Sequence, residues 1–233
     1  MAIISLRIVD ATVNGCSMEF ETEEQLVNLL EKVYSSPRSR WVWIREFNMP
    51  NGIADLVGIG LATHAANRST LGHIPPQWAY TLHCLPHEEP FSLGNVATLA
   101  NVTMGSARLM LRNFGDSGFC AQIPDSKQWI KTRQPEPVAK KIVAIEAKLR
   151  DWRRALYQAA QHVAYASQAW VVLDRSALPS SRRHAQEFAD RGIGLAGLSA
   201  EGELDIVMHP RDNLPRRQNR YWQANAEIAR RLM

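Results

Sequence analysis

The chain has 233 residues, of which 45% are hydrophobic and 21% are charged, and this length suits one sizeable folded core or two small domains. Its formal net charge of +4 favours a nucleic-acid partner only weakly. No apolar run reaches the length of about 18 residues that a membrane-spanning helix needs, so we expect no membrane partner. The three cysteines are odd in number and far apart, which argues against a disulfide framework and favours a cytoplasmic protein.

The first part of the chain is expected to contain strands around one helix. Residues 1–10 read as a strand rather than a cleaved leader. Residues 21–34 carry apolar side chains at helical spacing, with Thr22 as the candidate N-cap. Residues 41–47 are β-branched and aromatic, and residues 53–59 return as an apolar strand. A connector is expected to follow.

The two central strands are expected to form a hairpin. The Asn51-Gly52 pair is a strong signal for a two-residue turn. That turn would place Asn48 opposite Asp55, and the two-residue period of strands would put Glu46, Asn48 and Asp55 on one face.

Residues 76–135 follow the order helix, helix, turn, helix and hairpin, which resembles a winged helix. The helix after the turn would pack against the rest of this region through an apolar side that includes Met104. Polar and basic residues would face outward, and these types reach phosphates and base edges. We expect DNA contacts from Thr103, Ser106, Arg108, Arg112 and Asn113 on this helix and from Lys127 and Lys131 on the hairpin. Many winged helices bind only protein, so that alternative stays open.

From residue 136 onward, strands and helices alternate, which predicts an α/β sheet. The expected strands are 142–148, 169–174, 193–199 and 202–210, and the expected helices are 151–168, 180–191 and 219–233.

The strand at 142–148, Ile-Val-Ala-Ile-Glu-Ala-Lys, ends with two charges on one face. Residues two apart in a strand point the same way, so Glu146 and Lys148 would project side by side. Burying both is costly unless they pair, bind a metal or take part in chemistry. The same acid-any-lysine spacing at Asp125-Ser126-Lys127 falls among turn-forming residues, without a strand to hold it.

A second inward acid, Asp55, interrupts the apolar strand at 53–59. Two strands that each contribute a carboxylate, with a lysine beside one of them, predict a site for a divalent metal. Mg²⁺ prefers carboxylate oxygens and retains water, which suits phosphate-containing substrates. The plainer alternative is that Glu146 and Lys148 form a partly exposed pair and that Asp55 is an ordinary edge residue.

These residues resemble the PD-(D/E)xK nuclease superfamily: Asp55 in NGIADLVGI, Glu146 and Lys148 in IEAK, and Glu46 in REFNMPNGIAD. Proline does not directly precede Asp55, a departure that is common in this divergent group. The resemblance implies a restriction-endonuclease-like core, with a central mixed sheet flanked by helices. It implies Asp55 and Glu146 as ligands of Mg²⁺ or Mn²⁺, Lys148 as catalytic base or stabiliser, and Glu46 as an auxiliary ligand.

The helix after Lys148 adds to the resemblance. Gln161-His-Val-Ala-Tyr165 is similar to the Q-x-x-x-Y signature of the exonuclease-type branch, which implies that Gln161 and Tyr165 help to position DNA. Arg154 falls on the same stripe of the expected helix, so we expect it to contact DNA as well. An ordinary amphipathic helix would explain this stripe nearly as well.

The combined hypothesis is a metal-dependent nuclease core, residues 1–75 and 136–233, with a winged helix inserted at 76–135. The core would hydrolyse phosphodiester bonds in DNA and the insert would dock the DNA. The alternatives are a catalytically inactive DNA-binding regulator, or a protein-interaction module of a defence or repair assembly. A homodimer and a larger nucleic-acid-processing complex are both compatible with the sequence.

Overall fold

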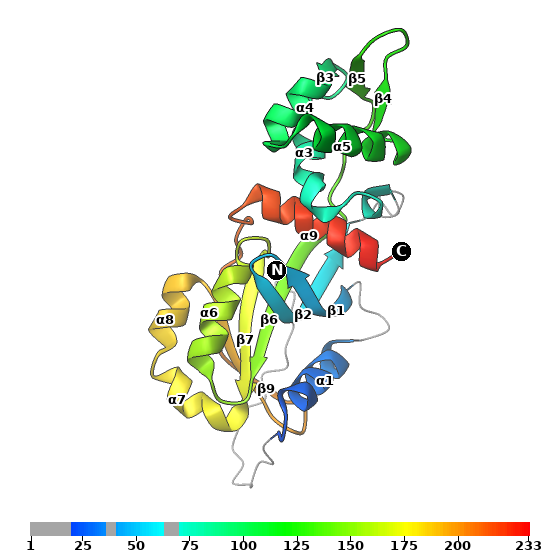
Figure 1. Cartoon of the computed structure of the whole chain (residues 1–233). Helices are drawn as coiled ribbons and strands as arrows, with labels where there is room; N and C mark the ends of the chain where they lie inside the picture. The colour runs from blue at the N-terminus through cyan, green and yellow to red at the C-terminus, as the bar shows by residue number, and fades with distance from the viewer. Residues whose placement is uncertain (1–19, 36–40, 63–69) are drawn as a thin grey trace. The chain divides into compact units, whose positions relative to one another are not determined.

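A computed structural model describes residues 20–35, 41–62 and 70–233. The strand expected at 1–10 and Cys16 lie outside the described residues. The chain divides into two compact units (Figure 1). The first unit comprises residues 1–60 and 141–214, and the second comprises residues 61–140 and 215–233. The sequence hypothesis placed residues 215–233 with the core segments, whereas this division places them with the inserted segment.

A six-stranded mixed sheet lies at the centre of the first unit, in the order β1-β2-β6-β7-β8-β9. The β1–β2 and β8–β9 pairs are antiparallel, whereas β6, β7 and β8 run parallel. The strands are β1 (Trp41–Met49), β2 (Gly52–Leu61), β6 (Ala139–Lys148), β7 (Gln168–Asp174), β8 (Gly194–Leu198) and β9 (Leu204–Met208). The α/β class with a mixed central sheet is therefore confirmed.

Helices cover both faces of this sheet (Figure 1). They are α1 (Glu23–Tyr34), α6 (Trp152–His162), α7 (Leu178–Arg182) and α8 (Ala185–Arg191), with a 3-10 turn at Arg175–Ala177. Alternate side chains of β7 point to opposite faces. Val172 packs with α1 in one core, and Val171 packs with α6 and α8 in the other. The sheet is thus buried on both sides.

The helix predicted at 21–34 is confirmed, and Thr22 caps it by accepting the N–H of Gln25 at 3.2 Å. Two other helices are shorter than predicted. The helix after Lys148 ends at His162 instead of residue 168. The helix predicted at 180–191 is interrupted between Arg182 and Ala185, which separates α7 from α8.

The hairpin forms, but its turn lies one residue earlier than predicted. Met49 pairs with Gly52, so Pro50 and Asn51 form the turn, and Asn48 pairs with Ile53 rather than with Asp55. Proline lacks the N–H that a ladder position requires, which favours Pro50 in the turn. The register moves by two residues, so each side chain keeps its predicted face.

The second unit contains a three-stranded antiparallel sheet in the order β3-β5-β4, with helices around it (Figure 1). Its elements are a 3-10 turn at Pro76–Trp78, α3 (Ala79–Cys84), β3 (Pro90–Ser92), α4 (Leu93–Ala100), α5 (Met104–Asp116), β4 (Cys120–Gln122), β5 (Gln128–Lys131) and α9 (Gln218–Arg231). The short strand β3 was not predicted. Phe114 of α5 is buried as expected, but Met104 is 52% exposed because it begins the helix.

The C-terminal helix α9 is held in the second unit by specific contacts. Asn225 accepts the backbone N–H of Ala139 at 2.8 Å, and the rings of Trp222 and His83 stack with centroids 4.3 Å apart.

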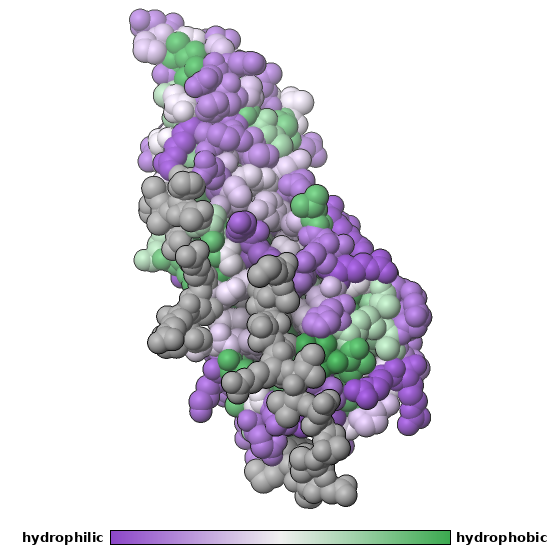
Figure 2. Space-filling model, turned by 180° about the vertical axis from the view of Figure 1, so that it is seen from behind, coloured by the Kyte–Doolittle hydropathy of each residue, from purple (hydrophilic) through white to green (hydrophobic). Residues whose placement is uncertain are grey.

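On the face shown in Figure 2, the described residues are mostly hydrophilic, and the apolar ones form small separate patches. None of the helices in the described part of the chain combines the length and apolar character that a membrane crossing requires.

Candidate functional site

The candidate site lies at the carboxyl end of β6. Ile145 and Ala147 of this strand pack toward α1. Strand alternation therefore directs the intervening Glu146 to the opposite face, where it meets His162 of α6. Lys148 ends the strand, and from there its ammonium group reaches Glu23 at the start of α1. β2 is the neighbouring strand, and it brings Asp55 beside them. The structure thus brings together the three residues that the sequence singled out most strongly.

Lys148 is the centre of this group. Its Nζ lies 3.2 Å from Asp55 Oδ2, 4.0 Å from Glu146 Oε2 and 3.0 Å from Glu23 Oε2. It also donates to the carbonyl of Ala147 at 2.9 Å. Burial disfavours the charged lysine, but the Asp55 charge and the hydrogen bonds to Glu23 and Asp55 outweigh this effect and raise the pKa of Lys148.

Asp55 links the two strands. Its Oδ2 accepts the backbone N–H of Ala147 at 2.8 Å as well as the Lys148 ammonium. A side-chain carboxylate thus bonds a backbone donor of β6. The Asp55 side chain is 28% exposed and that of Glu23 is 50% exposed, so solvent reaches the Lys148 cluster at both carboxylates.

Glu146 is completely buried and is paired with His162, the last residue of α6. Its Oε1 lies 2.5 Å from His162 Nε2. Burial raises the pKa of Glu146, while the hydrogen bond to His162 acts in the opposite direction. Among the described residues, Glu146 Oε2 and His162 Nδ1 have no hydrogen-bond partner. Each of these two atoms is able to form one further hydrogen bond.

Tyr165, which was predicted to contact DNA, is not at the surface in this structure. Tyr165 lies beyond the end of α6 and is completely buried against Phe47 and His162. Burial also raises the pKa of its hydroxyl. Because α6 ends at His162, Gln161 and Tyr165 do not share a helical stripe.

Three further residues from the sequence hypothesis lie outside the contacts of Lys148. Glu46 is exposed and has a left-handed φ of 47°, at a break in the β1–β2 pairing. Gln161 is half-buried beside His162. Arg154 is exposed in the first turn of α6, and its backbone N–H is capped by Asp151.

The residues predicted to contact DNA from the second unit are mostly at its surface. Thr103 is the N-cap of α5, and its hydroxyl lies 3.1 Å from that of Ser106. Arg108, Arg112 and Lys127 are exposed. Asn113 is half-buried and donates to the carbonyl of His73 at 3.1 Å.

Lys131 is the exception, because it is 1% exposed and cannot decorate the hairpin. Its Nζ donates to the carbonyls of Leu82 and His83 at 3.3 and 3.1 Å. These carbonyls belong to the last turn of α3, where they lack intrahelical partners. Lys131 therefore caps this helix from inside the unit, and burial lowers its pKa.

Sequence reasoning missed two residues of the cluster, Glu23 and His162. His162 could have been found, because it falls on the same buried stripe of α6 as Trp152, Ala155 and Ala159. A histidine among apolar residues facing the strand that carries Glu146 indicates a buried partner. Glu23 offered no such signal, since acids are common in the first turn of any helix.

The fit to a metal ion depends on two carboxylates. Mg²⁺ is commonly held by one or two carboxylates together with water and substrate phosphates. Asp55 and Glu146, whose Oε2 accepts no hydrogen bond, would supply the two carboxylates. Within residues 20–35, 41–62 and 70–233, no three His, Cys, Asp or Glu side chains form a group that could hold a metal.

Comparisons with protein-family models, curated proteins and solved structures gave no match.

Proposed function

We propose that this chain is a metal-dependent nuclease that hydrolyses phosphodiester bonds in DNA. The observation that carries the proposal is that carboxylates from two strands, Asp55 and Glu146, approach the ammonium group of Lys148 within 3.2 and 4.0 Å. These are the residues that resemble the PD-(D/E)xK superfamily. A mixed sheet with helices on both faces is also the architecture that this resemblance implies.

Asp55 and Glu146 would hold Mg²⁺ or Mn²⁺. When bound, such an ion would make an attacking water more acidic and offset the negative charge that develops on the phosphate. The protein side chains have separate tasks. His162 fixes one oxygen of Glu146 and leaves the other directed toward Lys148. Hydrogen bonds to a ligating carboxylate commonly fix its orientation in this way.

Lys148 would act as an electrostatic stabiliser. Its ammonium group is held by Glu23, Asp55 and the Ala147 carbonyl, so its position is set before a substrate arrives. A fixed positive charge in a partly water-excluded site favours the charge that builds up in phosphoryl transfer. The same contacts keep Lys148 from being a costly unpaired buried charge.

The second unit would dock the DNA as a winged helix. Its order of α3, α4, α5 and the β4–β5 hairpin supports this assignment, and β3 completes a small sheet. Arg108 and Arg112 on α5 and Lys127 between β4 and β5 are exposed and could reach phosphates.

A second candidate, a protein-interaction module, is favoured by the apolar surface of the same unit. Met104 and Leu109 of α5 are 52% and 57% exposed, and Leu99 of α4 is 47% exposed. A continuous patch formed by such side chains would mark a protein-binding surface. The burial of Lys131 also removes one of the charges expected to contact DNA.

The deciding experiment is a cleavage panel of linear, circular and branched DNA with Mg²⁺, Mn²⁺ or EDTA. We expect cleavage with either metal and none with EDTA. Lys148→Ala and Glu146→Gln should abolish cleavage. Lys140→Ala is the matched control, because Lys140 is an exposed lysine of the same strand. Unchanged metal-dependent cleavage by the Lys148→Ala protein would overturn the proposal. DNA binding without cleavage by the wild type would favour a regulator, and no DNA affinity would favour the interaction module.

A further inference from the structure

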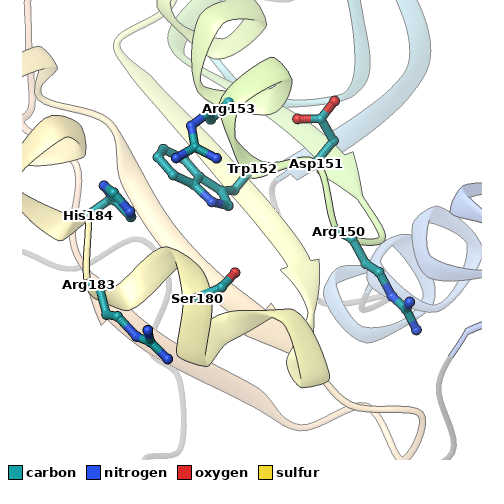
Figure 3. Close-up of a pocket in the computed structure, with 7 residues that line it drawn as sticks. All are labelled: Arg150, Asp151, Trp152, Arg153, Ser180, Arg183 and His184. Carbon is teal, nitrogen blue, oxygen red and sulfur yellow. The ribbon is translucent and has the colours of Figure 1, made fainter.

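A second feature of the first unit is an open pocket of about 390 Å³, and none of the residues that line it belongs to the Lys148 cluster. It is lined by residues 150–153, at the start of α6, and by Ser180, Arg183 and His184, around α7 (Figure 3). α6 follows the carboxyl end of β6, and α7 follows the carboxyl end of β7. These two strands are parallel, so the pocket and Lys148 lie at the same edge of the sheet.

The lining of the pocket is strongly basic. Arg150, Arg153 and Arg183 contribute three guanidinium groups, against the single carboxylate of Asp151. Asp151 is engaged as the N-cap of α6, where it accepts the N–H of Arg154 at 3.0 Å. The positive end of the α6 dipole adds to the charge of the arginines. The pocket therefore favours an anion.

The aromatic residue of the pocket does not provide a surface for stacking a base. The Arg153 guanidinium carbon lies 4.4 Å from the centroid of the Trp152 ring, and the His184 ring stacks on Trp152 at 4.6 Å. Trp152 is only 5% exposed as a result. These contacts instead fix the positions of Arg153 and His184. Recognition at this pocket must come from charge and hydrogen bonding.

Arg183 is the side chain best placed to take up a new partner. Within the described part of the chain, it has no ion pair or side-chain hydrogen bond, whereas the neighbouring Arg182 pairs with Asp205. Figure 3 shows Arg183 and Arg150 on opposite sides of Ser180. A guanidinium group offers several N–H donors in one plane, which suits the oxygens of a phosphate.

We propose that this pocket binds a backbone phosphate of the nucleic-acid strand that is cleaved at the Lys148 cluster. The inference rests on the proposed function, because it assumes a nucleic-acid substrate. Phosphate contacts position a strand without reading its sequence, which is the role that a basic pocket without a stacking surface can fill. Arg153 and Arg183 are positioning residues in this proposal, and neither takes part in the chemical step.

The test measures DNA binding in EDTA, so that cleavage does not interfere, with labelled single-stranded and duplex DNA over a range of salt concentrations. Arg183→Gln and Arg153→Gln should each weaken binding severalfold and reduce the slope of log affinity against log salt by about 1. Arg191→Gln is the matched control, because Arg191 is exposed at the end of α8, outside the pocket. It should bind as the wild type does.

Wild-type affinity and salt slope in both pocket variants would overturn the proposal, as would a wild-type protein without salt-dependent DNA affinity. Arg183→Gln keeps the test decisive if Arg153→Gln disturbs the packing of Trp152. The two proposals fail differently. A protein that binds DNA through the pocket but never cleaves it would refute the nuclease, and with it cleavage of the bound strand, but would leave phosphate binding at the pocket intact. Normal cleavage with unchanged binding by the variants would refute only the pocket.

Discussion

His162 Nε2 and Glu146 Oε1 lie 2.5 Å apart in the interior of the protein, and both side chains are at most 1% exposed. The pair joins the end of α6 to the end of β6. A buried carboxylate is costly unless a hydrogen-bonded partner compensates for its lost hydration. His162 supplies this compensation and directs the second oxygen of Glu146 toward Lys148.

Removing His162 should therefore destabilise the protein through Glu146. We expect His162→Leu to lower the free energy of unfolding by about 3 kcal/mol or more, because it leaves Glu146 buried without its partner. Urea unfolding of His162→Leu, Glu146→Leu and the double variant measures the coupling. The double variant should lose less than the two single losses added together, since apolar replacement of both partners leaves no buried charge. Additive losses would show that the two residues do not act as a pair.

Lys131 should matter for folding rather than for nucleic-acid contact. Lys131→Met removes the donor for the carbonyls of Leu82 and His83, so we expect a loss of about 1–3 kcal/mol in the free energy of unfolding. Lys127→Met, in the exposed turn of the same hairpin, should change stability by no more than about 0.5 kcal/mol. Chemical denaturation compares the two proteins. If both variants are equally stable, Lys131 does not cap α3 in solution.

Glu227 should make the stability of the protein depend on pH in the acid range. Burial raises the pKa of this carboxyl, but hydrogen bonds from Arg230 and Arg231 outweigh burial and lower it. A lowered folded-state pKa gives stability that is present above the unfolded pKa and lost as the pH falls through the folded value. Glu227→Gln should therefore cost about 1 kcal/mol or less at neutral pH, because Arg230 is largely exposed.

That cost should shrink toward zero as the pH falls through the folded pKa of Glu227, since the wild-type carboxylate then becomes protonated. Urea midpoints of wild type and Glu227→Gln at neutral and acid pH test this expectation. Asp116→Asn, an exposed acid of the same unit, serves as control. A difference between wild type and Glu227→Gln that stays constant across this range would contradict the assignment.

Gly52 should be required by the hairpin for its backbone conformation. Its φ is +138°, a value that side chains rarely adopt, and an added Cβ would lie 3.9 Å from His162, which is an ordinary contact. Backbone strain alone should make Gly52→Ala destabilising by about 1–3 kcal/mol. Gly105→Ala in α5, where φ is not positive, should leave thermal stability unchanged or raise it. Equal melting temperatures for wild type and Gly52→Ala would rule out this strain.

The sequence predicted features that depend on near neighbours along the chain. The helix at 21–34 and its Thr22 cap follow from spacing and side-chain chemistry within a few residues. Glu146 and Lys148 share a face because strand side chains alternate, whatever lies around them. The acid-any-lysine spacing in a buried strand was therefore enough to locate the cluster.

Tertiary structure decided which charges are buried and what each of them contacts. Glu23 reaches Lys148 across 125 positions of the chain, and Lys131 reaches Leu82 across 49. Tyr165 and Lys131 were expected at the surface, yet both are buried. Local sequence gives a residue's type and its face on an element, but burial depends on which other elements cover that face. That covering is set by packing between segments far apart in the chain, where no local pattern records it.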